Sequence, residues 1–264
     1  MHNSPLVSVV IPCYNHGKFL QETVESVMKS SYRHYEIIIV DDESKDNSLD
    51  IAYNLSEKFS QIRIRVLNQK NSGPARARNH GIKEAEGEII LPLDADDLIS
   101  SNYIEEGVKI LLENPQIKVV YAKARMFGAI EKEWKLKPFS HYNLALDNMI
   151  YVSALFRKRD WEKVGGFTES PILVREDWEF WIKMLKSGGL AYQMPFNGFF
   201  YRIHSNSRRK SMNNDRKKKE IEYLNTHHKD FFDQQLSGKL REQRTYSKAF
   251  NKAQKLFNNL FSNK

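Results

Sequence analysis

Three carboxylates crowd into four positions directly after a short apolar run. Asp94, Asp96 and Asp97 follow residues 88–93, which read Glu-Ile-Ile-Leu-Pro-Leu. An apolar run of this length, bounded by polar residues, is typical of a strand buried on both faces of a parallel sheet. Acids packed at the carboxyl end of such a strand, where open α/β sheets bind ligands, repel one another unless a cation or a ligand lies between them. Because Mg²⁺ is usually held by one or two carboxylates plus substrate phosphates, the pattern predicts a metal-bridged diphosphate site at Asp94 and Asp96.

The same stretch has a simpler interpretation. A solvated acidic loop could cap the next helix, with Asp97 or Ser100 at the N-cap. Short motifs carry false positives, so this stretch alone leaves both interpretations open.

Polar groups also follow two other expected strands. Tyr14 and Asn15 follow the first strand, and Asp41 and Asp42 follow the second. The carboxyl ends of neighbouring parallel strands meet at one edge of a sheet. We therefore expect these groups to converge on the edge that carries the three carboxylates.

Phosphate would have to be bound without a glycine-rich loop. The chain has neither Gly-x-Gly-x-x-Gly after the first strand nor Gly-x-x-x-x-Gly-Lys-Ser/Thr, which argues against a dinucleotide fingerprint and a P-loop. A metal and the side chains of Arg or Lys are then the remaining phosphate ligands. Arg78, near a helix start, suits a bidentate contact with phosphate or a sugar hydroxyl; the alternative is a solvated helical arginine.

The elements that must position these groups alternate between strand and helix. β-branched runs predict the strands, and apolar residues at three- and four-residue spacing predict the helices. The expected order is strand 6–12, helix 18–31, strand 36–40, helix 51–59, strand 62–67, helix 75–86, strand 88–93, helix 101–113 and strand 117–122. This alternation predicts an α/β fold with a doubly wound, mostly parallel sheet and helices on both faces.

The periodicity weakens in the second half. Residues 123–147 are irregular and carry scattered aromatics, which is typical of binding loops or lids. Beyond them we expect strand 149–156, a short helix at 161–164, a helix that opens at 175–181, and strands 190–194 and 199–203. Trp178 and Trp181 are candidates for stacking on a sugar ring, with core packing favoured for at least one of them.

Composition limits the class of protein. The chain has 264 residues, of which 41% are hydrophobic, and a single cysteine, Cys13. One cysteine excludes an internal disulfide framework. The sequence has no secretory signal pattern and no apolar run of membrane-spanning length, so a cytoplasmic protein is expected.

The net charge of +8 is concentrated near the C-terminal end. From Arg208 onward 15 Lys and Arg face 6 Asp and Glu, whereas the preceding residues have 26 against 27. We therefore divide the chain into a body, 1–210, and a basic amphipathic helical tail, 211–264. The tail has apolar residues at three- and four-residue steps, as in Phe250, Ala253, Phe257 and Leu260.

Three partners would suit this tail. Its basic surface and apolar stripe fit an anionic membrane face. Packing back on the body, or contact with a second copy in a homodimer, would bury the same stripe. The sequence leaves these open.

Six blocks together resemble the family 2 glycosyltransferases, inverting enzymes of the GT-A fold. The blocks, in the family's order and spacing, are Val7-Ser-Val-Val-Ile-Pro-Cys-Tyr-Asn15, Ile39-Val-Asp41-Asp42-Glu-Ser44, Ala77-Arg78-Asn79-His-Gly81, Leu93-Asp94-Ala-Asp96-Asp97, Gly165-Gly-Phe167 and Glu176-Asp177. The resemblance covers roughly residues 5–210, nearly all of the body. One departure is Glu43, where many relatives have glycine.

The resemblance implies a nucleotide-sugar site and a metal site. It implies that Asp42 hydrogen-bonds the nucleotide base, which lies against Pro12 and Tyr14. The implied nucleotide-sugar residues are Pro12, Tyr14, Asn15, Asp42, Arg78, Asp94 and Glu176. The implied ligands of Mg²⁺ or Mn²⁺ are Asp96 directly, Asp94 nearer the ribose or the metal waters, and His204 near the diphosphate.

The resemblance also implies that Asp177 is the catalytic base. Displacing a nucleoside diphosphate leaves negative charge on the phosphate, which a divalent cation stabilises. The acceptor hydroxyl needs a carboxylate that accepts its proton, and one such base suffices for a single inversion, unlike the paired carboxylates of glycosidases. Asp177 lies at an expected helix start, where the dipole favours its ionised form; simple helix capping by Glu176 and Asp177 is the alternative.

The function expected from these observations is metal-dependent, inverting transfer of one sugar from a nucleotide-sugar, expected to be a UDP-sugar, to an acceptor hydroxyl. The expected acceptor is a glycan or lipid-linked intermediate of a bacterial surface glycan (capsule, O-antigen or exopolysaccharide), which is compatible with a peripheral position at the inner face of the plasma membrane. The Gln-x-x-Arg-Trp motif of processive synthases is not in the sequence.

The sequence argues against two other classes of protein. A nucleotidyltransferase would carry a glycine-rich basic loop after the first strand, where this chain has Cys13-Tyr-Asn-His-Gly17. A nucleic-acid-binding protein would interleave aromatic and basic residues in one groove. Here the charge is in the tail and the motifs are in the body, so no nucleic acid partner is expected.

Overall fold

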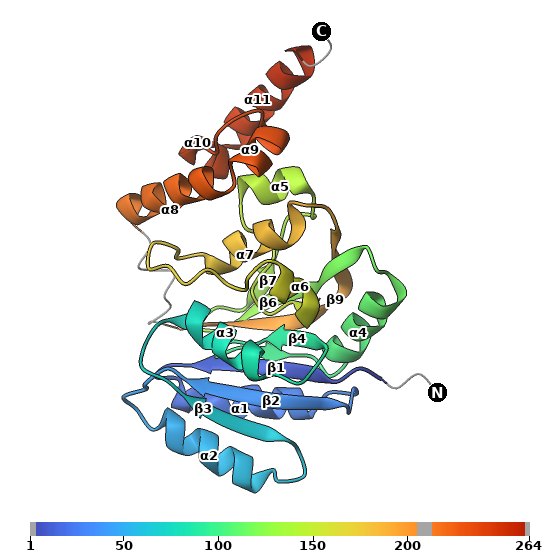
Figure 1. The fold of residues 1–264 in the computed structure, drawn as a ribbon, viewed down its shortest axis with the longest axis vertical. Helices are drawn as coiled ribbons and strands as arrows, with labels where there is room; N and C mark the ends of the chain where they lie inside the picture. Colours follow the sequence, from blue (N-terminus) through green and yellow to red (C-terminus); the bar gives the residue numbers. More distant parts are fainter. Residues whose placement is uncertain (1–3, 205–212, 262–264) are drawn as a thin grey trace.

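A single nine-stranded sheet organises the body of the protein (Figure 1). The computed structural model describes residues 4–204 and 213–261. The strands are β1 (Val7–Cys13), β2 (Tyr35–Asp41), β3 (Ile64–Asn68), β4 (Ile89–Pro92), β5 (Leu98–Ile99), β6 (Ile117–Gly128), β7 (Lys132–Trp134), β8 (Leu155–Arg157) and β9 (Leu190–Ile203). Their order in the sheet is β3-β2-β1-β4-β8-β6-β9-β5, and β7 pairs with β6.

Helices cover both faces of this sheet, and further helices extend beyond it at the C-terminal end (Figure 1). The helices of the body are α1 (Gly17–Met28), α2 (Ser48–Lys58), α3 (Pro74–Glu84), α4 (Tyr103–Glu113), α5 (His141–Leu146), α6 (Lys158–Lys163) and α7 (Glu176–Leu185). The tail forms α8 (Asn214–His227), α9 (Lys229–Leu236), α10 (Glu242–Tyr246) and α11 (Lys248–Phe261).

The first half of the sheet is parallel, as the sequence predicts. Strand β1 pairs in parallel with β2 and β4, and β2 pairs in parallel with β3. Every residue of β1 and β2 is buried, which explains why both strands are mostly apolar in sequence. Two buried polar side chains within them pair with each other, because Ser8 Oγ donates to Glu36 Oε1 (2.7 Å). Helix α3 packs directly on β1, because a Cβ at Gly81 would lie only 2.4 Å from Val10 Cγ1.

The second half of the sheet differs from the expected elements. Residues 190–203 form one continuous strand instead of two, and β6 extends to Gly128 to pair with it in parallel. Register shifts around Lys123 interrupt the pairing, and such bulges break the side-chain alternation on which strand prediction depends. Strand β8 covers only Leu155–Arg157, whereas a strand at 149–156 was expected.

The tail is divided between a packed part and a projecting part. The boundary at 210/211 lies outside the described residues. Helices α8 and α9 bury Leu224, Phe231 and Phe232, so the apolar stripe of these two helices packs inward. Helix α11 extends away from the body (Figure 1), and its Leu256 and Phe257 are 57% and 63% exposed. Within the described residues, none of the helices combines the length and the apolar character that crossing a membrane requires.

Candidate functional site

Arg78 joins two of the predicted carboxylates. It lies on α3 with only 4% of its side chain exposed, and its two terminal nitrogens donate to Asp94 Oδ1 (2.6 Å) and Glu176 Oε1 (2.9 Å). Burial alone would lower the pKa of this guanidinium, but the charges of Asp94 and Glu176 outweigh it and raise the pKa above its ordinary value. Arg78 is therefore always charged and connects the acids after β4 to the start of α7. The predicted contact of Arg78 with phosphate would compete with these two carboxylates.

Asp96 lies between two histidines. Its Oδ2 is 2.9 Å from His204 Nε2 and 3.8 Å from His16 Nε2. One ligand atom from each of the three residues lies within 4.8 Å of the other two. The sequence predicts Asp96, Asp94 and His204 as metal ligands. This cluster contains Asp96 and His204 but not Asp94, and it adds His16, which follows β1 in the same loop as Tyr14. The only sequence signal for His16 is its position shortly after the first strand.

Asp97 does not cap α4, so that part of the simpler interpretation is wrong. The N-cap of α4 is Asn102, and Asp97, 1% exposed, accepts a hydrogen bond from the backbone N–H of Arg202 (2.8 Å). Arg202 Nε in turn donates to the carbonyl of Asp96 (2.8 Å). These contacts hold the Asp94–Asp97 loop against Arg202, near the end of β9 and two residues before His204. The sequence does not predict them.

Asp177 lies in the first turn of α7 with two hydrogen-bond donors. Asn148 Nδ2 donates to its Oδ2 (2.8 Å), and the backbone N–H of Trp178 donates to its Oδ1 (2.9 Å). Burial, reinforced by the neighbouring charge of Glu176 and opposed by that of Arg78, raises the pKa of Asp177 to about 7. The expectation that the helix dipole favours the ionised form is thus outweighed by desolvation. A carboxylate with a pKa near the working pH suits a general base.

The carboxylate of Asp42 is held by the loop before α3. It accepts hydrogen bonds from the backbone N–H groups of Ser72 and Gly73 (both 2.9 Å) and from Gln69 Nε2 (2.8 Å). Gly73 adopts a φ of 87°, a conformation that glycine reaches without strain. Glu43, which replaces the family's glycine, adopts a φ of 62°.

Pro12, Tyr14 and Asn15 lie next to Asp42 at the end of β1. Pro12 is buried, whereas the ring of Tyr14 is 43% exposed. The side chain of Asn15 accepts a hydrogen bond from the backbone N–H of Lys45 (2.7 Å). Asn15 therefore ties the loop after β1 to the loop after β2.

The predicted residues lie along one edge of the sheet. Cys13 pairs with Asp41 in the β1–β2 register, and Asp42 N–H donates to the Cys13 carbonyl (2.8 Å). Strand β4, next to β1, ends just before Asp94, and Arg78 links Asp94 to α7. Cys13 itself is no nucleophile, because burial raises the pKa of its thiol to about 12.

Trp178 and Trp181 belong to the core, so stacking on a sugar ring is wrong for both. Each is 0% exposed. Their indole N–H groups donate to the carbonyls of Leu144 (2.7 Å) and Ile150 (2.9 Å). Both rings thereby pack α7 against the segment that contains Asn148.

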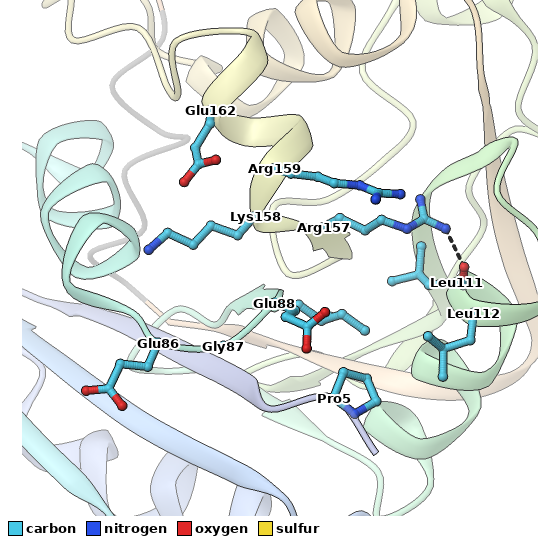
Figure 2. Close-up of a pocket in the computed structure, with 11 residues that line it drawn as sticks. Pro5, Glu86, Gly87, Glu88, Leu111, Leu112, Arg157, Lys158, Arg159 and Glu162 are labelled. Atoms are coloured by element: carbon cyan, nitrogen blue, oxygen red, sulfur yellow. Dashed lines mark hydrogen bonds between the residues drawn. The ribbon is translucent and has the colours of Figure 1, made fainter. Parts of the chain in front are cut away.

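A separate hollow of about 410 Å³ lies at the opposite edge, where β4 begins (Figure 2). Arg157, which points toward α4 in Figure 2, donates to the carbonyls of Leu111 and Ile117 (2.8 Å for Ile117). Lys158 donates to the carbonyl of Ala85 (2.6 Å). These cations satisfy carbonyls at or just beyond the ends of α4 and α3. The hollow contains none of the predicted site residues.

The sequence matches known proteins over most of the body. Residues 8–177 match the family model described as Glycosyl transferase family 2. The chain is 32% identical over 209 residues, 77% of this chain and 81% of the relative, to the putative teichuronic acid biosynthesis glycosyltransferase TuaG of Bacillus subtilis. It is 30% identical over 189 residues, 70% and 72% of the two chains, to the UDP-Glc:alpha-D-GlcNAc-diphosphoundecaprenol beta-1,3-glucosyltransferase WfgD of Escherichia coli.

Solved structures show the same fold. Residues 1–349 of TarS from S. aureus, in complex with UDP, superpose with a TM-score of 0.62 at 21% identity, covering 84% of this chain and 72% of that one. The mannosyltransferase PcManGT of Pyrobaculum calidifontis, in complex with GDP-Man and Mn²⁺, gives a TM-score of 0.64 at 21% identity, covering 79% and 60%. The fold is therefore GT-A, and the protein is a glycosyltransferase rather than a nucleotidyltransferase. The chain belongs to glycosyl transferase family 2.

Proposed function

We propose that this enzyme transfers one sugar, with inversion, from a UDP-sugar to an acceptor hydroxyl in the synthesis of a bacterial surface glycan, in a reaction that depends on a divalent cation. The observation that carries the proposal is the chain of contacts from Asp94 through Arg78 to Glu176, next to Asp177. These contacts support a site in which the nucleotide-sugar donor and the catalytic base lie side by side.

Asp177 accepts the proton of the acceptor hydroxyl as that oxygen attacks the sugar carbon. Its pKa of about 7 matches this task, because an ionised carboxylate with such a pKa is a stronger base than an exposed one. Asn148 fixes the orientation of the carboxylate. One base acting on one face of the sugar gives a single inversion.

The donor set at Asp96 fits a divalent cation. His16, Asp96 and His204 supply two imidazole nitrogens and one carboxylate oxygen within 4.8 Å of one another. Mg²⁺ takes oxygen ligands, so a set with two imidazoles fits it poorly, and PcManGT, which has the same fold, was solved with Mn²⁺. We therefore expect Mn²⁺ to be favoured over Mg²⁺. When bound, the cation would stabilise charge on the leaving diphosphate.

The hydrogen bonds of Asp42 favour uracil over guanine. A carboxylate has about four acceptor positions, and three of those on Asp42 already receive N–H groups from Gln69, Ser72 and Gly73. One position remains for a base. Uracil presents a single N–H between two carbonyls, whereas guanine presents an N–H beside an amino group, which needs two acceptors. The name of WfgD includes UDP-Glc, and TarS was solved with UDP.

The acceptor side is proposed to lie at the inner face of the plasma membrane, with the protein cytoplasmic and peripheral. The name of WfgD includes a diphosphoundecaprenol-linked acceptor, and that of TuaG includes teichuronic acid biosynthesis. Helix α11 supports contact with an anionic lipid face, because its exposed Leu256 and Phe257 lie on a helix that also carries Lys248 and Lys252.

Thermal-shift titration tests the donor and the metal together. UDP-, GDP- and dTDP-sugars are compared with and without Mn²⁺, because a ligand at about 100 times its Kd stabilises the folded state by about 2.7 kcal/mol. We expect stabilisation by a UDP-sugar that requires Mn²⁺ and is lost in Asp96→Ala but not in the control Asp50→Ala, an exposed acid on α2. Stabilisation by the GDP-sugar alone would reject the assignment of a UDP-sugar as the donor. An unchanged Mn²⁺-dependent titration of Asp96→Ala would reject Asp96 as a metal ligand.

A further inference from the structure

The segment directly before Asp177 is hydrogen-bonded to the tail. Glu220, on α8, accepts hydrogen bonds at Oε1 from the backbone N–H groups of Val174 (3.0 Å) and Arg175 (2.8 Å). Its Oε2 accepts from Arg175 Nε (2.8 Å) and lies 2.6 Å from Arg175 Nη2. Asp177 follows two residues after Arg175, so this carboxylate anchors the entry to α7.

A second set of contacts leads from Arg175 to the carboxylate of Asp177. Arg175 Nη1 donates to Asp147 Oδ1 (3.2 Å), which also accepts the backbone N–H of Asn148 (3.0 Å). Asn148 Nδ2 donates to Asp177 Oδ2 (2.8 Å). The guanidinium of Arg175 also lies over the ring of Trp178, 4.3 Å from its centroid.

The burial of Glu220 argues against an incidental contact. Its side chain is 0% exposed, and a buried carboxylate is tolerated only when hydrogen-bond donors and a positive partner surround it. Two backbone N–H groups and one guanidinium meet that requirement. Glu220 lies outside residues 8–177, which match the family model, so the tail supplies a contact that this segment of the family does not itself contain.

We propose that Glu220 is a positioning residue for the reaction, and that helix α8 of the tail is thereby part of the catalytic unit. Glu220 orients Asp177 through Arg175, Asp147 and Asn148. This inference rests on the proposed role of Asp177 as the base. It assigns a function to the tail that differs from membrane contact, since α8 packs inward while α11 projects.

The test compares Glu220→Ala with His228→Ala. His228 also joins the tail to α7, because its Nε2 lies 2.9 Å from Glu179 Oε1 and it is buried, but it makes no contact with the segment before Asp177 among the hydrogen bonds of the described residues. Both variants remove a buried tail contact, so both should lower the Tm. We expect only Glu220→Ala to lower kcat, by about 10- to 100-fold, with the KM for the donor unchanged and the midpoint of the pH–rate profile displaced.

Glu220→Gln provides the rescue. Its amide oxygen can still accept from Val174 and Arg175, while its amide nitrogen cannot accept from the Arg175 guanidinium. We expect a kcat between those of the parent and Glu220→Ala, and Glu220→Gln decides the question if the alanine variant does not fold. The proposal is overturned if kcat falls equally in Glu220→Ala and His228→Ala, or if both Glu220 variants keep the parental kcat and pH profile.

Asp177→Asn, measured in the same assay, distinguishes failure of the proposed base from failure of the positioning role of Glu220. If Asp177→Asn retains full transfer, the proposed base is wrong, whatever the Glu220 variants do. If Asp177→Asn is inactive and the Glu220 variants are normal, only the positioning role fails.

Discussion

The acids after β4 and the proposed base on α7 are positioned by different means. Asp94 and Asp96 follow directly from a buried strand, so chain continuity places them at the sheet edge. Asp177 is oriented by Asn148, 29 residues earlier, and its entry segment is held by Glu220, 45 residues beyond Arg175. A strand end positions its next residues locally, whereas this helix start depends on contacts between distant elements. Changes on the α7 side should therefore affect proton transfer and leave donor binding intact.

Asp177→Asn should show the largest difference between the two regions, because it should strongly slow transfer on the α7 side and preserve donor binding at the acids after β4. Loss of the base should lower kcat by about 10²- to 10⁴-fold, while Mn²⁺-dependent stabilisation by the UDP-sugar remains. Because the pKa of Asp177 is raised to about 7, its ionised form costs folding stability above pH 7 and less as pH falls. The variant should thus unfold no more easily than the parent at pH 8. Parental transfer rates, or loss of nucleotide binding, would contradict the proposed division.

The pH dependence of transfer should show the same group titrating. Burial and the charge of Glu176 raise the pKa of Asp177 to about 7, against the opposing effects of Arg78 and Asn148. Only the ionised form accepts a proton, so kcat should rise with pH to a plateau above about 7 and be about 100-fold lower at pH 5. Because metal affinity at imidazole ligands itself depends on pH, kcat is measured at saturating Mn²⁺ and saturating donor at each pH. A flat profile from pH 5 to 8 would show that another group is the base.

Arg78→Lys should weaken the connection between the two regions. A lysine can reach Asp94 or Glu176 but lacks the two terminal nitrogens with which the guanidinium of Arg78 contacts both. Loss of one of these two charge-assisted hydrogen bonds should lower the free energy of unfolding by about 2 kcal/mol, measured by urea denaturation, and should lower kcat. Arg76→Lys is the matched control, because Arg76 lies on the same helix and is 61% exposed. Equal stability of the two variants would show that the bridge contributes little.

His16→Ala should have the smallest effect and act only on the metal side. Removing one of three candidate ligands should lower Mn²⁺ affinity about tenfold, by analogy with losses at other metal-site positions, and saturating Mn²⁺ should restore kcat. His34→Ala, at an exposed position, should leave Mn²⁺ affinity unchanged. An unchanged Mn²⁺ titration of His16→Ala would restrict the metal site to Asp96, Asp94 and His204.

The parallel half of the fold, and the residues along its edge, can be predicted from the sequence. Buried parallel strands such as β1 and β2 need mostly apolar side chains on both faces, so they appear in the sequence as largely apolar runs. The polar residues that follow each run must lie at the sheet edge. Asp42, Asp94 and Asp96 were identified in this way. The resemblance to a family added Asp177, which no local pattern distinguished from a helix cap.

The groups that orient these residues are visible only once the chain is folded. The bulged pairing of β6 with β9 hides the side-chain alternation of both strands, so the sequence showed a loop and two short strands where the structure has a long pair. Arg202, Asn148 and Glu220 act through single side chains on partners far along the chain, and such contacts leave no periodic signal in the sequence. Desolvation, which raises the pKa of Asp177 against the helix dipole, likewise depends on what packs around α7 and not on the residues within it.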